Sequence, residues 1–203
     1  MANYAIILAA GDGKRLGSKT PKCFLKINKK PIYQYSLELF QIFSQIKQII
    51  LVVPREYLSK IKVDSKKIKT VVGGKTRNES FERGIRAISN PKAQDKIIIH
   101  DAARINLQPE DILKILNSKM SYGTLCYLGK PNKSDLRFGQ YNIQTPQFCR
   151  FFVYKHTTKN KCGRDLFTYL NAKPTKGNFI ISSNKSQNWK ITFRKDLDKA
   201  KSI

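Results

Sequence analysis

The stretch YAIILAAGDGKRLGSKTPK, residues 4–22, decides the fold because it joins an uninterrupted apolar run to a loop of glycines and cations. The apolar part, residues 4–10, has the length and composition of a strand buried on both faces of a parallel sheet. Similar runs follow at residues 46–54 (IKQIILVVP), 69–74 (KTVVGG) and 96–104 (KIIIHDAAR). We therefore expect a mostly parallel sheet that contains these four segments.

A helical pattern follows the first strand. In residues 31–43 (PIYQYSLELFQIF), apolar side chains recur at steps of three and four residues, as on one face of a helix. This spacing predicts a helix whose core-facing side chains are Ile32, Tyr35, Leu39 and Phe43.

Three more helices are expected further along the chain. Residues 109–116 (PEDILKIL) open with a proline and two acids, which favours a helix start. The end of the chain, residues 188–203, predicts a short strand and then a helix whose first turn contains Asp196. Residues 78–88 (NESFERGIRAI) predict a helix with the buried positions Phe81, Ile85 and Ile88.

The alternation of strands and helices predicts the α/β class, with one Rossmann-like domain over residues 1–203. Right-handed crossovers place helices on both faces of a mostly parallel sheet, which gives three layers. In such folds ligands bind where strands end at their carboxyl edge. Here that edge is expected to carry residues 9–22 and residues 101–104.

Composition narrows the function classes. The 39 basic and 14 acidic residues give a net charge of +25, which attracts polyanions. The excess is mostly lysine, 29 residues against 10 arginines, and it is spread along the chain rather than gathered in a tail. This pattern favours a compositional bias together with a small anionic substrate over a nucleic-acid partner.

Location and redox state follow from short signals. The first eleven residues have too short an apolar run for a membrane span and lead directly into the glycine loop, so we expect a cytoplasmic protein without a signal peptide. The four cysteines, at positions 23, 126, 149 and 162, form no Cys-x-x-Cys pair. They are expected to be reduced and mostly buried thiols rather than zinc ligands or disulfides.

The glycine loop suits a phosphate group. Gly11 and Gly13 let successive backbone N–H groups approach an anion closely. Because Leu16 stands where a third glycine would be needed, the loop matches neither the dinucleotide pattern nor the phosphate-loop pattern. Arg15 and Lys22 place two cations beside it at the sheet edge, which suits a triphosphate.

At this point the sequence resembles the nucleotidyltransferases that carry LAAGxGxR and a later Pro-Lys after the first strand. It is most similar to the 2-C-methyl-D-erythritol 4-phosphate cytidylyltransferase family. The resemblance extends in order through VVGGKTRNES, IIIHDAAR, RFGQYNIQTPQF and NWKITFRKDLDKA. It implies transfer of the cytidylyl group of CTP to a sugar-alcohol phosphate, with release of pyrophosphate and assistance from Mg²⁺.

The resemblance also implies roles for individual residues. Arg15 and Lys22 match positions that stabilise the charge of the transition state, and Arg137 and Lys190 match positions that hold the acceptor phosphate. Asp101 is expected near the ribose and the metal. Nucleotide binding is further assigned to Ala9, Ala10, Gly11, Asp12, Gly13, Lys14, Gly74, Arg77, Ser80 and Thr145, of which Gly74 and Ser80 read the base with support from Arg77.

Two neighbouring residues receive structural roles instead. His100 is expected to be a packed imidazole, since no second histidine or cysteine stands at metal-ligand spacing. Arg104 is expected to brace the loop after the strand. Lys75 departs from the family pattern, because this position often carries an acid there.

The chain also departs from the family at its dimer arm. The resemblance implies a long β-arm that hooks onto a second subunit, but the corresponding segment, about residues 123–137, is short here. Asp165 is a candidate remnant of an acidic segment that usually precedes the last strands. The resemblance allows a homodimer, but such a dimer would have to form with this truncated arm.

Two alternatives stay open at this stage. The first is a cytidylyltransferase for another alditol phosphate, such as ribitol 5-phosphate. The second is a degenerate family member whose basic surface binds nucleic acid or another partner.

Overall fold

The computed structural model describes residues 1–61, 63, 65–128, 136–138, 141–156, 166, 170, 176–182 and 188–202. Within this part of the chain, no helix is both long enough and apolar enough to cross a membrane.

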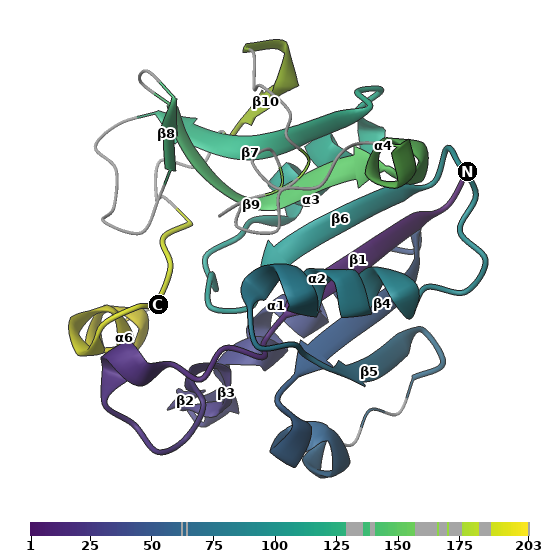
Figure 1. Ribbon diagram of the computed structural model, residues 1–203. Coiled ribbons are helices and arrows are strands. Elements are labelled where there is room, and N and C mark those ends of the chain that lie inside the picture. The colour runs from purple at the N-terminus through teal and green to yellow at the C-terminus, as the bar shows by residue number, and fades with distance from the viewer. Residues whose placement is uncertain are drawn as a thin grey trace.

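The centre of the molecule is an eight-stranded sheet in the order β10-β7-β9-β6-β1-β4-β5, with β8 paired to β9 (Figure 1). Pairing is parallel except along β9, which runs antiparallel to β6, β7 and β8. The prediction of a mostly parallel sheet is therefore confirmed. The strands are β1 (Asn3–Leu8), β4 (Ile46–Val53), β5 (Ile68–Val72), β6 (Lys96–Asp101), β7 (Tyr122–Leu128), β8 (Leu136–Phe138), β9 (Tyr141–Arg150) and β10 (Phe179–Ile181).

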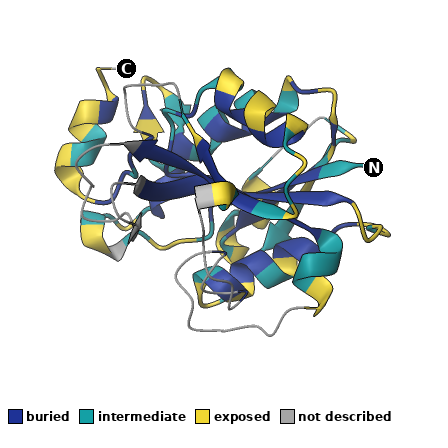
Figure 2. Ribbon diagram, turned by 90° about the horizontal axis from the view of Figure 1, so that it is seen from above, coloured by how far each residue is buried: buried dark blue, intermediate teal, exposed yellow. Residues whose placement is uncertain are grey.

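Helices cover both faces of the sheet, as predicted. Helices α1 (Ile32–Gln41) and α3 (Pro109–Asn117) pack on one face, and α2 (Arg77–Arg86) and α4 (Phe151–His156) pack on the other. Figure 2 shows the buried strands enclosed by helices whose outer faces are exposed. The remaining elements are the short helices η1 (Lys14–Leu16), η2 (Lys22–Phe24), η3 (Arg55–Lys60) and η4 (Lys176–Asn178), the pair β2 (Lys26–Ile27) and β3 (Lys30–Pro31), and α6 (Arg194–Ala200).

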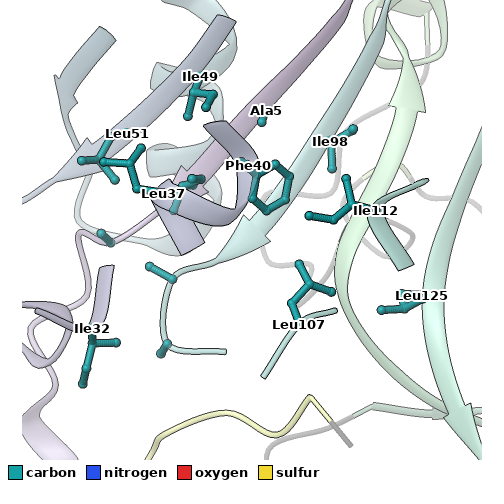
Figure 3. Packing of buried hydrophobic residues seen from close by; sticks show 14 of the residues in the cluster. Ala5, Ile32, Leu37, Phe40, Ile49, Leu51, Ile98, Leu107, Ile112 and Leu125 are labelled. Carbon is teal, nitrogen blue, oxygen red and sulfur yellow. The ribbon is translucent and has the colours of Figure 1, made fainter. Parts of the chain in front are cut away.

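The alternating side chains of the strands divide the core between these two faces. Along β1, Ala5 and Ile7 join the cluster beneath α1 and α3, while Tyr4 and Ile6 join the cluster beneath α2. Figure 3 shows the first cluster, in which Phe40 of α1 lies among side chains from the sheet. The middle of β1 is therefore apolar on successive residues because both of its faces are buried.

The predicted core stripe of α1 is confirmed in part, since two of its positions pack only at the edge of the core. Leu37 and Phe40 are buried, whereas Tyr35 and Leu39 are only partly buried. The helix is apolar around more than one stripe, so periodicity alone does not fix which stripe faces the sheet. Tyr35 lies at the edge of the contact, where its hydroxyl donates to the Ile27 carbonyl at 2.7 Å.

The other two interior helices match their predictions. Phe81, Ile85 and Ile88 are all buried, although α2 ends at Arg86, just before the last of them. Helix α3 begins at Pro109, as its proline and acids predicted.

The C-terminal prediction is half confirmed. Helix α6 forms, and the Asp196 Oδ2 accepts hydrogen bonds from the backbone N–H groups of Thr192 and Phe193 at 2.9 and 2.8 Å. The expected strand before it was wrong, because residues 188–193 have no strand structure. These residues bond singly to several different elements and form no ladder with one neighbouring strand.

Part of the lysine excess closes helix ends. Lys67, Lys69 and Lys96 donate from their Nζ atoms to carbonyls at or just after the C-termini of α1, α2 and α3, respectively. A cation at a helix C-terminus is favourable because the last carbonyls lack partners within the helix. Some of the net charge thus has a structural role that needs no polyanionic partner.

Candidate active site

A cleft of about 660 Å³ opens at the carboxyl ends of β1, β4, β5 and β6. The chain leaves β1 towards β4 on one side, and β6 lies on the other side of β1. This is the reversal point at which open α/β sheets bind ligands. The structure therefore has a cleft at the edge of the sheet where the sequence predicts a ligand.

The loop after β1 forms one wall of the cleft and holds Lys22 in place. Gly13 has φ +69°, and a Cβ added there would lie 2.6 Å from the Lys22 Cβ. Only glycine combines this backbone conformation with so close a neighbour. Lys22 is 8% exposed, and its Nζ donates to the Ile191 carbonyl at 2.8 Å.

The C-terminal helix completes this wall. Figure 1 shows α6 beside the loop that follows β1, although the two are separated by most of the chain. The Arg15 guanidinium carbon lies 5.9 Å from the centre of the Phe193 ring, at the start of α6. Arg15, Lys22 and Lys190 all line the same cleft.

Asp101, the last residue of β6, accepts from two cations. Its Oδ1 accepts from the Arg77 Nε at 3.1 Å, and its Oδ2 accepts from the Lys190 Nζ at 2.7 Å. Burial opposes ionisation of this carboxyl, but the charges of Arg77, Lys190 and Arg104 outweigh it and hold the pKa of Asp101 well below its usual range. Asp101 is therefore a fixed carboxylate that organises the surrounding cations.

A chain of hydrogen bonds fixes Asp101 from behind. The Thr145 Oγ1 accepts from the Asp101 N–H at 3.0 Å and lies 3.3 Å from the His100 Nδ1. The His100 Nε2 lies 3.1 Å from the Arg104 carbonyl. Since a carbonyl only accepts, Nε2 carries the proton and Nδ1 accepts from the threonine hydroxyl. The prediction of a packed imidazole at His100 is confirmed.

Lys22 lies in a crowded cationic environment. Burial lowers its pKa, and the charges of Lys190 and Arg15 act in the same direction, while Cys23 and Asp101 partly oppose the shift. An anion in the cleft would relieve this repulsion. Because the cleft is lined by more cations than acids, its charge favours an anionic ligand.

The turn between β5 and α2 forms the opposite wall. A Cβ added to Gly73 would lie 2.3 Å from the Ala10 Cβ, so this turn packs closely against the loop after β1. The Ser80 Oγ accepts from the Gly74 N–H at 3.1 Å. Arg83 closes the turn by donating to the Gly73 carbonyl at 2.7 Å.

The turn has Lys75 where the family often carries an acid, but the carboxylate of Glu79 lies at the same turn. The Glu79 Oε2 accepts from the Lys75 N–H at 2.9 Å. Thr76 accepts from the Glu79 N–H at 3.1 Å, which caps α2. The spacing Thr-x-x-Glu is a helix-start pattern that was readable from the sequence.

Most of the predicted binding residues meet at the cleft. Those that line it are Ala10, Gly11, Asp12, Gly13, Arg15, Lys22, Gly74, Arg77, Ser80, Asp101 and Lys190. The structure also adds residues that the sequence analysis missed, namely Arg55, Glu56, Arg83 and Thr192. Arg55 and Glu56 directly follow Pro54, the end of a predicted strand. Their position at the carboxyl end of that strand could have placed them at the cleft.

Of the other predicted residues, two lie elsewhere, and the side chains of two more are not described. Ala9 is buried, and its N–H donates to the Val52 carbonyl at 2.8 Å, so it supports the loop from below. Thr145 supports Asp101 and does not line the cleft. Arg137 belongs to β8, where its backbone lies opposite Asn142 of β9. The side chains of Arg137 and Lys14, like Cys162 and Asp165, lie outside the described part of the chain.

Acidic pH should weaken the fold through His100. Burial lowers the pKa of this buried imidazole from 6.5 to about 4, so the unfolded chain binds a proton more readily than the folded one between these values. The contribution of neutral His100 to the free energy of unfolding is then fully present above pH 6.5. It is lost as the pH drops towards 4, and the loss is about 3 kcal/mol. Urea unfolding at pH 7 and pH 4.5 measures this loss, and His100→Gln should reduce it.

Comparisons with known proteins agree with this geometry. The family model IspD, 2-C-methyl-D-erythritol 4-phosphate cytidylyltransferase, matches residues 3–128, which include the loop after β1, the turn between β5 and α2, and Asp101, but not Lys190 or Thr192. The chain belongs to this family. In the IspD family, the relative from Caldicellulosiruptor saccharolyticus is 32% identical over 100% of this chain and 97% of its own length. The one from Thermotoga neapolitana is 28% identical over 99% and 96%.

Solved structures of IspD proteins share the fold. The Francisella tularensis 2-C-methyl-D-erythritol 4-phosphate cytidylyltransferase superposes with a TM-score of 0.72 at 23% identity, covering 98% of each chain. A 4-diphosphocytidyl-2C-methyl-D-erythritol synthase superposes with a TM-score of 0.76 at 19% identity, covering 100% of this chain and 99% of that one. The resemblance seen in the sequence is thus confirmed for both family and fold.

Proposed function

We propose that this protein joins CTP and 2-C-methyl-D-erythritol 4-phosphate to give a CDP-alditol and pyrophosphate. The observation that carries the proposal is the meeting of Arg15, Lys22 and Lys190 around one cleft at the sheet edge, in a member of the IspD family. The names of the curated relatives supply the acceptor.

The cleft charges suit this reaction. An acceptor phosphate oxygen must attack the α-phosphorus of CTP in line, yet both reactants are anions. Arg15 and Lys22 offer positive charge on the loop beside the triphosphate, and Lys190 offers it beside the acceptor. Because these cations are already held by neighbouring groups, little reorganisation accompanies the rise of negative charge in the transition state.

Mg²⁺ is part of the proposal and fits the residues in a limited way. The described residues contain no group of three or more His, Cys, Asp or Glu side chains that could hold a metal ion by themselves. Mg²⁺ commonly uses one or two carboxylates together with substrate phosphates. Both Asp101 oxygens accept from Arg77 and Lys190, so Asp101 would hold the ion in exchange for one of these cations; Asp12 also lines the cleft. When bound, the ion would neutralise part of the charge on the phosphates.

The test of the proposed function is direct. The protein is incubated with CTP, Mg²⁺ and 2-C-methyl-D-erythritol 4-phosphate, while pyrophosphate release and ³¹P NMR of the product are recorded. Formation of the CDP-alditol supports the proposal, and its absence contradicts it. Ribitol 5-phosphate in a parallel reaction tests the alternative acceptor. A gel-shift assay with RNA at 0.15 M salt tests the alternative of a nucleic-acid binder.

Arg137→Ala should mainly impair use of the acceptor. The family resemblance assigns Arg137 to the acceptor phosphate, and loss of one such contact should raise the acceptor KM and lower kcat/KM by about 10²-fold. Steady-state kinetics with each substrate varied in turn measure the effect. Unchanged acceptor kinetics would remove Arg137 from the site.

Assembly and location complete the proposal. We propose that the protein acts in the cytoplasm and that any homodimer forms through the short segment around residues 123–137. Light scattering of the purified protein gives the oligomeric state.

A further inference from the structure

Lys190 is carried by residues 188–192, which have no regular secondary structure. Within this segment the Ile191 N–H donates to the Ala103 carbonyl at 2.9 Å. Asn188, at the start of the segment, is fully buried. A side chain on an irregular segment is placed only as accurately as the contacts that hold the segment.

We propose that Asn188 is a positioning residue for Lys190. The Asn188 Nδ2 donates to the Thr145 carbonyl at 2.9 Å, and the Asn188 carbonyl accepts from the Arg104 guanidinium at 2.7 Å. These two bonds tie the segment to β9 and to the loop after β6. Thr145 also bonds to the backbone of Asp101, which pairs with Lys190 at 2.7 Å. Thr145 therefore holds both the segment that carries Lys190 and Asp101, the ion-pair partner of Lys190.

The buried amide of Asn188 is better explained by a role in positioning its segment than by a contribution to the stability of the fold. Among the residues that the structure describes, the Asn188 Oδ1 accepts no hydrogen bond. A buried carbonyl oxygen without a partner costs free energy that an apolar side chain of similar size would avoid. What leucine could not supply is the bond from Nδ2 to β9. The asparagine is therefore explained better by this bond than by packing alone.

Hydrogen exchange tests the placement without any substrate. In Asn188→Leu, the backbone amide of Ile191 should exchange about tenfold faster, because the segment opens locally, while the core amides of β1 stay as protected as in the wild type. Unchanged exchange at Ile191 would overturn the proposal whether or not the protein is an active transferase. Asn188→Ala provides the same comparison should leucine impair folding.

Kinetics then test whether Asn188 acts through Lys190, and this arm rests on the proposed function. Asn188→Leu should lower kcat/KM for the acceptor about 10- to 100-fold while the core amides of β1 stay protected. In a Lys190→Ala background the same replacement should have no further effect, because the side chain that it positions is already absent. Additive losses would overturn the proposal. Inactivity of the wild type would count against the proposed function alone.

A matched control comes from α1. The Ser36 Oγ is also buried and, within the described residues, has no hydrogen-bond partner. Ser36→Ala should leave both the Ile191 exchange rate and the acceptor kinetics unchanged. A comparable change in Ser36→Ala would show that the effects of Asn188→Leu are not local and would overturn the proposal.

Discussion

Replacement of Lys22 by alanine is expected to reduce cytidylyl transfer from CTP by about 10²- to 10³-fold, the usual result of removing one preorganised charge from a transition state. Lys22 lies against Gly13 of the loop after β1, and its Nζ donates to the Ile191 carbonyl. Its charge therefore needs no rearrangement to meet a triphosphate. Pyrophosphate release under saturating substrates measures the loss.

Two further variants separate charge from packing. Lys22→Met retains most of the aliphatic stem, so it should keep the wild-type Tm and lose as much activity as Lys22→Ala. Lys26→Ala removes an exposed lysine of β2 and should change neither property. Near-normal turnover in Lys22→Met would show that the ammonium group is not needed for the reaction.

Replacement of Asp101 by asparagine should damage both stability and activity. The change leaves Arg77 and Lys190 without their shared carboxylate, and both cations are partly buried. We expect the free energy of unfolding to fall by about 2 kcal/mol, less than for a fully buried pair because solvent reaches the two cations. Transfer activity should fall by about 10²-fold, because Lys190 is no longer held in the cleft.

The control for Asp101 is another aspartate in an ion pair. Asp198 pairs with Lys201 at 3.0 Å on the exposed surface of α6. Asp198→Asn should change the free energy of unfolding by less than about 0.5 kcal/mol and leave activity intact. Urea unfolding and initial rates measure both variants. Equal stability of Asp101→Asn and the wild type would show that the carboxylate does not organise the site.

The fold and most of the cleft lining were predictable because their signals are local. The apolar run at residues 4–10 indicates a strand by its own composition, whatever its neighbours are. Gly13 and Lys22 are close in the sequence and lie on the same loop. The stripe of α1 was predicted only in part for the opposite reason, since several faces of that helix are apolar and only the sheet selects one. The strand expected before α6 failed similarly, because among the described residues no strand pairs with residues 188–193.

The sequence by itself determined the order of strands and helices, the glycine loop and the presence of cations in family motifs. Only the tertiary structure decided that Lys190 pairs with Asp101, that Lys22 bonds to the backbone of Ile191, and that Asn188 is buried against β9. The physical reason is range. Periodicity and spacing report forces between near neighbours, whereas these contacts join residues that come together only after the crossovers and loops have packed around the sheet.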